Sequence, residues 1–110
     1  MSIVIHITYS GRNGSALRLA QEMCASGIVN QIRAEEGNLA YAYYQPLHDP
    51  ESILLIDKWA SQTALDKHHA SPMMQQIIAL REKYDLHMHV ERFLSDDGDI
   101  PEGDRGFIRE

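Results

Sequence analysis

Cysteine, basic charge and long hydrophobic runs are scarce in this sequence, and each scarcity excludes a class of protein. The single cysteine, Cys24, cannot form a disulfide within the chain, and no basic or histidine neighbour would stabilise its thiolate. Ten basic residues stand against sixteen acidic ones, and the resulting net charge of −6 repels nucleic-acid phosphates. No hydrophobic run approaches the ~20 residues that span a bilayer, and none opens the chain as a signal peptide. These absences predict a cytoplasmic protein that binds neither nucleic acid nor membrane.

The chain has the length of one domain and too little length to bury a large core by itself. A domain of 110 residues buries roughly two thirds of the surface that its unfolded chain exposes, so it is either modestly stable or completed by a partner subunit. Residues 1–94 carry the patterns of a folded domain, whereas residues 95–110 form an acidic C-terminal tail. Composition favours a solvated tail. Exposure of the hydrophobic side chains of Phe107 and Ile108 to solvent would be unfavourable, so docking of the tail on a partner subunit is the alternative.

Four segments carry the patterns of strands. Residues 3–10 alternate between two faces and are rich in β-branched side chains, which predicts a strand. Residues 39–47 are rich in tyrosine and predict a second strand. Residues 52–60 predict a third strand, which is apolar on both faces as a central strand should be. Residues 86–94 predict the fourth strand.

Helices are predicted between these strands. Apolar residues three and four apart predict one helix capped by Ser15 or Asn13, with a kink or break near Gly27 because glycine is unfavourable inside a helix. Ser61 is expected to cap a second helix. Pro72, which suits a first helical turn, is expected to start another directly after it.

The order of elements is βαββαβ, with the second helical segment bent into a pair. Two interleaved split βαβ units of this kind give an α+β, ferredoxin-like fold with a four-stranded antiparallel sheet. The helices cover one face of such a sheet and leave the other, partly apolar, face open. An open apolar face in a small chain implies a second sheet from a partner, and hence a homodimer.

The end of the third strand and the helix after it carry the two side chains best suited to a catalytic site. Trp59 ends that strand at the mouth of the space between sheet and helices, where pocket lining is favoured over a purely structural role. His68 is the candidate general base, because a neutral imidazole can accept a phenolic proton near neutral pH. Helical spacing places His68 on the same face as Leu65 and turns His69 away by about 100°. His69 remains the alternative.

These residues belong to a spaced pattern that resembles a known family. The pattern consists of Glu36-Gly37-Asn38, Asp57-Lys58-Trp59, Ala64 to His68, and Ser71-Pro72. It is similar to the antibiotic biosynthesis monooxygenase family, whose members are ferredoxin-like proteins that pair into dimeric α+β barrels. Many members oxidise phenols or quinols with molecular oxygen and no cofactor. The resemblance therefore implies a cofactor-independent monooxygenase that acts on a small aromatic substrate and dioxygen.

The resemblance also implies roles for individual residues. Trp59 would stack on a planar substrate, His68 would take its proton, and the Asn38 amide would bind substrate or dioxygen. Relatives carry glutamate at Asp57, and the shorter side chain puts its contact with His68 in doubt. Met73 and Met74 stand where many relatives have histidine and an aromatic residue, which makes the site more apolar. The substrate-binding set would comprise Tyr41, Tyr43, Asp57, Leu65 and Met73.

Two alternatives remain open, and a third, a metal site, is disfavoured. A metal site would need His6 on the first strand to meet His87 and His89 on the fourth, but no acidic or thiol ligand has clear spacing with them, and no metal is expected. An isomerase of a small phosphorylated signal metabolite would need cationic side chains in the pocket, drawn from Lys58, Lys67 and Arg92. A ligand-binding or stress protein without turnover would use the same scaffold.

Overall fold

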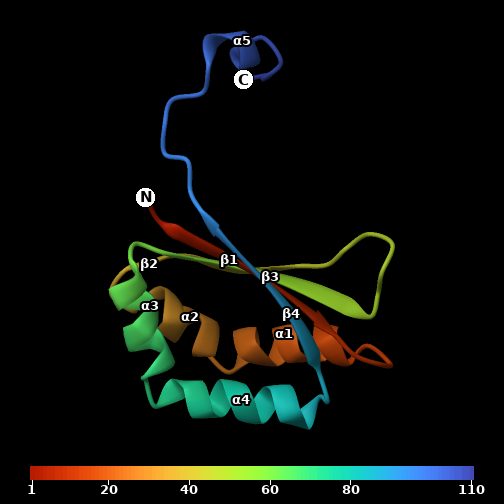
Figure 1. The fold of residues 1–110 in the computed structure, drawn as a ribbon. Helices are drawn as coiled ribbons and strands as arrows, with labels where there is room; N and C mark the ends of the chain where they lie inside the picture. Colours follow the sequence, from red (N-terminus) through yellow and green to blue (C-terminus); the bar gives the residue numbers. More distant parts are fainter.

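The computed structural model describes residues 1–110 as one sheet with helices on one side and a projecting C-terminal segment (Figure 1). The strands are β1 (Ile3–Ser10), β2 (Asn38–Tyr44), β3 (Ser52–Trp59) and β4 (His87–Leu94). The helices are α1 (Ser15–Ala25), α2 (Ile28–Arg33), α3 (Gln62–His69), α4 (Met73–Lys83) and the short α5 (Glu102–Arg105). None of these helices combines the length and the continuous apolar surface that a membrane-spanning helix needs.

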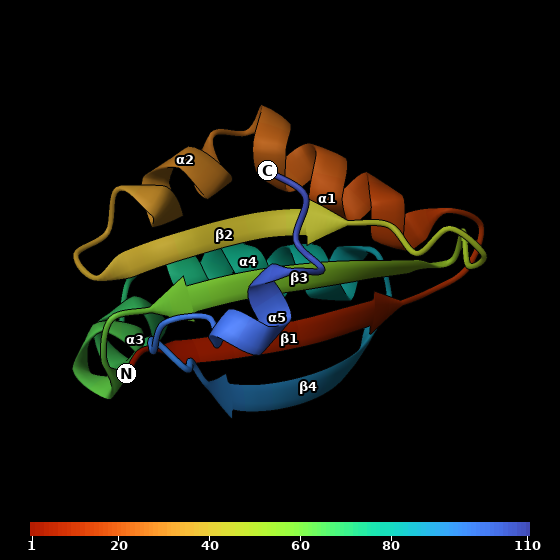
Figure 2. The same ribbon diagram turned by 90° about the horizontal axis from the view of Figure 1, so that it is seen from above.

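The sheet has the order β2-β3-β1-β4, and every neighbouring pair is antiparallel (Figure 2). The predicted α+β class, the ferredoxin-like order and the pairing of first and fourth strands are confirmed. β2 ends at Tyr44 rather than at Leu47, because the chain turns away at Pro46, which has no N–H group for the ladder. Leu47 lies in the β2–β3 loop and is 95% exposed.

The first helical segment is broken, as predicted, and its cap is not the predicted one. Gly27 adopts a left-handed conformation, with φ +87°, between α1 and α2, a backbone that a side chain would disfavour. Neither Ser15 nor Asn13 caps α1 through its side chain. Glu51 does so from the β2–β3 loop, because its carboxylate accepts the backbone N–H groups of Asn13 at 2.6 Å and Gly14 at 2.9 Å. The sequence around α1 does not reveal this contact, because Glu51 lies 37 residues further along the chain than Gly14.

One face of the sheet forms the core with the helices. In β1 and β3 every second residue is buried on that face, in keeping with the two-residue period of a strand. Eighteen hydrophobic residues make up the core, and the largest among them is Trp59, which is 0% exposed. The core therefore lies between the sheet and helices α1 to α4 (Figure 1).

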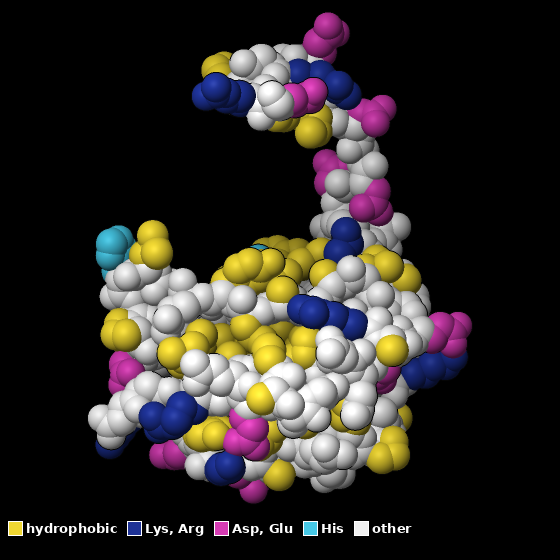
Figure 3. All heavy atoms as spheres, turned by 180° about the vertical axis from the view of Figure 1, so that it is seen from behind, with side chains coloured by type: hydrophobic (Ala, Val, Ile, Leu, Met, Phe, Trp, Pro, Cys, Tyr) yellow, Lys and Arg dark blue, Asp and Glu magenta, His cyan; other side chains and the backbone are white.

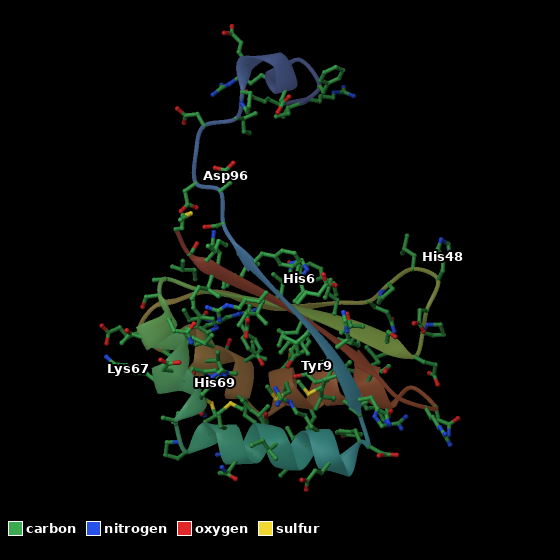
Figure 4. All side chains as sticks on the ribbon, in the orientation of Figure 1. His6, Tyr9, His48, Lys67, His69 and Asp96 are labelled. Carbon is green, nitrogen blue, oxygen red and sulfur yellow. The ribbon has the colours of Figure 1, made fainter.

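The opposite face of the sheet has no helix over it. Figure 4 shows His6 on this open face and Tyr9 on the helix side of the same strand. Hydrophobic side chains from all four strands reach the open face, and Figure 3 shows hydrophobic atoms exposed at the level of the sheet below the projecting tail. This open apolar face consists of Val4, Ala42, Tyr44, Leu54, Ile56 and Phe93, as the register of the strands requires.

The C-terminal tail leaves the sheet after β4 and rises on the side of the open face (Figures 1 and 2). It makes few contacts with the rest of the chain. At its start, Ser95 bonds Ser2 through backbone and hydroxyl groups. Beyond that point every residue of the tail is exposed, and Phe107 is 91% exposed.

Candidate functional site

A cavity of about 250 Å³ lies between the helix-covered face of the sheet and helices α3 and α4. Eight of its twelve lining residues are hydrophobic, and the polar ones are Asp57, two adjacent histidines and an arginine. An apolar wall with a few convergent polar groups is typical of a small-molecule site. The lining residues are Ile5, Ile7, Tyr41, Leu55, Asp57, His68, His69, Met74, Ile77, Arg81, Met88 and Val90.

His68 occupies the buried side of α3. The Ser61 hydroxyl caps this helix by accepting the Ala64 N–H group at 3.1 Å, as predicted. One helical turn further, Leu65 and His68 both face the core, and His68 is only 4% exposed. The His68 ring stacks on Trp59, with 4.8 Å between ring centroids and 28° between the planes. The side chain of His68 is therefore fixed by packing as well as by its helix.

Glu35 holds the other side of the His68 ring. His68 Nδ1 lies 2.7 Å from Glu35 Oε1 in the loop between α2 and β2. A carboxylate can only accept, so Nδ1 carries a hydrogen, and in the neutral imidazole the lone pair is then on Nε2. Gly37 allows this loop to approach α3, because it adopts φ +81° and any side chain there would collide with Ala64. The loop thus selects one tautomer of the imidazole.

His69 also lines the cavity, but from an exposed position on α3. Its ring centroid lies 5.8 Å from that of His68. Partial burial, and then the nearby His68, lower the pKa of His69 below its usual value. Figure 4 shows His69 pointing toward the interior while Lys67 points outward. Both histidines therefore border the cavity, and only His68 is buried and held by a carboxylate.

Asp57 brings a buried carboxyl group to the cavity wall. Its Oδ1 atom is buried and has no hydrogen-bond partner, and neither has the neighbouring Trp59 Nε1. Burial raises the pKa of Asp57 to about 6, although the nearby indole N–H of Trp59, which lies outside hydrogen-bond geometry, and the positive charges of a protonated His68 and of Arg81 act to lower it. Trp59 itself lies behind the cavity and does not line it.

Arg81 carries a positive charge into the cavity from α4. Its Nε donates to the Tyr9 hydroxyl at 3.1 Å, and its guanidinium lies 5.6 Å from the centre of the Tyr9 ring. No other hydrogen bond or ion pair of the Arg81 side chain is present, so its remaining N–H groups are free. None of the cations considered from the sequence, Lys58, Lys67 and Arg92, lines the cavity.

Two tyrosines of β2 lie next to each other on the covered face. Tyr41 lines the cavity and is buried, whereas Tyr43 packs against the core without lining it. Their hydroxyl groups are 3.5 Å apart, and their rings meet edge to face. Burial raises the pKa of both phenols far above the usual value, so both are neutral near neutral pH.

The remaining predicted site residues lie outside the cavity. The Asn38 amide donates to the Ala40 carbonyl of its own strand at 3.2 Å, beside a bulge. Leu65 is a core residue, and Met73 packs on the core while its neighbour Met74 lines the cavity. Met73 and Met74 are neighbours in α4, and the sequence pattern alone does not determine which of the two faces the cavity.

The histidines considered for a metal site do not gather. His6 packs its ring against Phe93, and His89 lies near Glu91 with 3.5 Å between His89 Nε2 and Glu91 Oε1. No three histidine, cysteine or acidic side chains are placed to hold a metal ion. Strand spacing explains this result, because His87 and His89 pair with Ser10 and Thr8 rather than with His6.

Sequence reasoning missed Glu35 and Arg81. Glu35 stands in a loop, and only its position directly before Glu36-Gly37-Asn38 connects it with the site. Arg81 lies on the face of α4 that carries Met74 and Ile77, at helical spacing from both, a signal that could have identified it.

The fold and the cavity together define a class: a small α+β domain with a ferredoxin-like sheet and a buried histidine beside an apolar cavity. The family model described as antibiotic biosynthesis monooxygenase matches residues 2–80. The chain belongs to this family, and the predicted resemblance is confirmed.

Known proteins similar to the chain agree with this membership. YcnE of Bacillus subtilis, a proposed monooxygenase, is 27% identical over 55 residues, which are 50% of this chain and 58% of YcnE. The chain thus matches little more than half the length of that relative. A proposed antibiotic biosynthesis monooxygenase from Deinococcus radiodurans has a TM-score of 0.77 at 22% identity, covering 92% of this chain and 99% of that one. SnoaB, a cofactor-independent oxygenase from Streptomyces nogalater, has a TM-score of 0.73 at 11% identity, covering 92% and 98%. These structural matches establish the shared fold.

Proposed function

We propose that the protein is a cofactor-independent monooxygenase that oxidises a small aromatic phenol or quinol with dioxygen. One observation carries this proposal: a largely apolar cavity brings together a buried, carboxylate-held imidazole and an unsatisfied carboxylate oxygen. A planar hydroxyaromatic molecule suits both the apolar wall of the cavity and its polar groups. Its ring suits the apolar wall, and its hydroxyl groups supply the hydrogen-bond donors that Asp57 Oδ1 lacks.

His68 acts as the general base in this proposal. Glu35 fixes the hydrogen on Nδ1 and stabilises the imidazolium that forms when Nε2 accepts the phenolic proton. Stacking on Trp59 holds the ring in place. Trp59 is therefore a positioning residue, which acts through His68 rather than by stacking on the substrate.

Arg81 and Asp57 divide the polar contacts with the substrate. The free N–H groups of Arg81 stabilise the phenolate oxygen as its charge develops. Asp57, whose pKa is about 6, accepts a hydrogen bond from a second hydroxyl group once it is ionised. Tyr41 and Met74 form the apolar wall on either side. Tyr43, Leu65, Met73 and Asn38 support that wall and the loop of Glu35 from outside the cavity.

The reaction needs no redox group of the protein because the substrate supplies the electrons. The phenolate transfers one electron to dioxygen, and the resulting pair of radicals combines to form a carbon–oxygen bond at the ring. Proton transfer from that ring carbon and cleavage of the oxygen–oxygen bond then release water and leave a ring carbonyl. One oxygen atom of dioxygen thus enters the quinone product and the other leaves as water. The apolar cavity confines the radicals until they combine.

A homodimer completes this proposal. The open apolar face of the sheet would pack on the same face of a second copy, as two sheets do in a sandwich. The tail rises on this side, and its exposed Phe107 and Ile108 would dock on the partner subunit.

Dioxygen uptake tests the proposed function. Metal-stripped protein is supplied with a panel of reduced quinols and polycyclic phenols, and uptake is compared with the autoxidation rate. His68→Ala is expected to lower kcat by about 10²- to 10⁴-fold, which is the range for loss of a general base. His48→Ala is the matched control, because His48 is an exposed histidine of the β2–β3 loop, far from the cavity (Figure 4).

The outcome separates the proposal from its alternatives. Uptake that survives His68→Ala would contradict the role of His68. No uptake across the panel by a folded protein, with tight binding of the same phenols, would favour a binding protein. Turnover of a phosphorylated metabolite without dioxygen would favour the isomerase.

A further inference from the structure

A second hollow lies where β1 and α4 end, and it shares no lining residue with the cavity of His68. It measures about 360 Å³, and only one of its ten lining residues is hydrophobic. The hollow forms where the turn after β1 meets the turn before β4, because Ser10 and His87 are paired in the sheet. Its size is that of a small-ligand site, and its wall is unsuited to an aromatic substrate.

Cationic side chains converge on this hollow in a protein of net charge −6. Arg12, Arg18 and Lys83 line it beside His87, and Asp85 is the one acidic residue in its wall. The Arg12 side chain has no hydrogen bond or ion pair, and Arg18 uses one N–H group, on the Asn13 carbonyl at 2.7 Å. Unlike them, Lys83 is already bound, to Glu22 at 2.8 Å. The two arginines therefore bring most of the unneutralised positive charge.

The backbone around the hollow is also unusual. Asn13 and Asp85 are the two non-glycine residues of the chain with positive φ, at 55° and 49°, and both line the hollow. Asparagine and aspartate enter this region more readily than other residues, so the sequence supports both turns. The backbone N–H groups of Asn13 and Gly14 are already bonded to the Glu51 carboxylate, so side chains rather than these N–H groups are available to a ligand.

We propose that this hollow binds a small, hydrophilic metabolite that carries a phosphate group. Arg12 and Arg18 would hold the phosphate through paired N–H groups, which match its oxygens in geometry and charge. His87 and the hydroxyls of Ser10 and Ser15 would contact the polar remainder of the ligand. The site stands apart from the proposed oxygenase activity and does not depend on it.

Titration with inorganic phosphate, pyrophosphate and malonate tests the site. Backbone amide shifts of Gly11, Arg12 and His87 are followed by NMR at constant ionic strength, so that screening by added salt does not change. Saturable binding of phosphate or pyrophosphate at these amides is expected. The double variant Arg12→Ala/Arg18→Ala is expected to weaken binding at least about tenfold, since charge-assisted hydrogen bonds are lost.

Matched variants make the result decisive. Arg105→Ala/Arg109→Ala removes the same charge from the tail and should leave the affinity unchanged. Arg12→Ala alone serves if the double variant does not fold, because Arg12 is exposed and its side chain has no hydrogen bond or ion pair to lose. Equal binding by wild type and Arg12→Ala, or no saturation, would overturn the proposal. Tighter binding of malonate than of either phosphate would overturn the assignment of the ligand class.

Discussion

The two faces of strand β3 differ in one respect: the covered face holds a carboxyl group among its buried hydrophobic residues, and the open face holds hydrophobic residues that are partly exposed. On the face that the helices cover, Asp57 is buried without a hydrogen bond at one oxygen, beside the buried Trp59. On the open face, Ile56 and Leu54 are partly exposed between neighbouring strands. A stable monomer would place the carboxylate outside and the hydrophobic residues inside. The buried carboxyl group fits the proposed chemistry, and the partly exposed hydrophobic residues fit the proposed association with a second copy.

Of the changes on the two faces, removal of Trp59 from the covered face should have the largest effect on stability. Trp59→Ala is expected to lower the free energy of unfolding by about 3–5 kcal/mol, because a fully buried indole leaves a cavity. Urea denaturation at fixed protein concentration measures the loss. Leu47→Ala, a change in the exposed loop, should stay within about 0.5 kcal/mol. A small effect of Trp59→Ala would mean that the covered face is loosely packed.

Asp57 should make stability depend on pH. Its folded pKa, about 6, lies above the ordinary 3.8, so the stability contributed by the protonated form is complete below pH 3.8 and is lost as the pH rises through about 6. Asp57→Asn stays neutral and is expected to be up to about 3 kcal/mol more stable than wild type at pH 8. The two proteins should converge near pH 4. Urea denaturation at both pH values measures this, and a constant difference would assign the effect to something other than ionisation.

The sequence made the covered face only partly predictable. The three-residue spacing of Leu65 and His68 identified the buried histidine because helical phase is regular. Glu35 could not be found in this way, since its contact with His68 depends on a loop whose path is set by Gly37 and Ala64. The same limit applies to Glu51, which caps α1 across the fold. Regular elements were thus predictable from local pattern, and contacts made by loops were not.

A charge on the open face should weaken association and spare the chemistry of the covered face. Ile56→Asp is expected to destabilise the proposed dimer by about 2 kcal/mol, the scale of a central interface residue. Analytical ultracentrifugation measures the dimer constant. Leu47→Asp introduces the same charge into the β2–β3 loop and should leave the constant unchanged. Wild-type protein that is monomeric at all concentrations would refute the proposed role of the open face in dimer formation.

Glu35→Gln should produce the smallest of these effects and the most specific one. Loss of the charged partner of His68 is expected to lower kcat by about tenfold, because a hydrogen bond to a charged group contributes about 1.5 kcal/mol or more. The acidic limb of the kcat profile against pH should also move, which a purely structural role would not cause. Glu36→Gln is the matched control, since Glu36 is exposed and only pairs with Lys67 at 3.7 Å. An unchanged pH profile in Glu35→Gln would remove Glu35 from the mechanism.

The contact of Glu51 with the start of α1 also has a consequence for the order in which the chain folds. Helix α1 follows the first strand directly, but the anion at its N-terminus arrives from 37 residues further along the chain. The helix therefore lacks this carboxylate until β3 has paired with β1, which sets Ser52 opposite Ser10 and brings Glu51 beside the start of α1. During synthesis this contact can form only after residue 51 has emerged, although the helix itself is made much earlier.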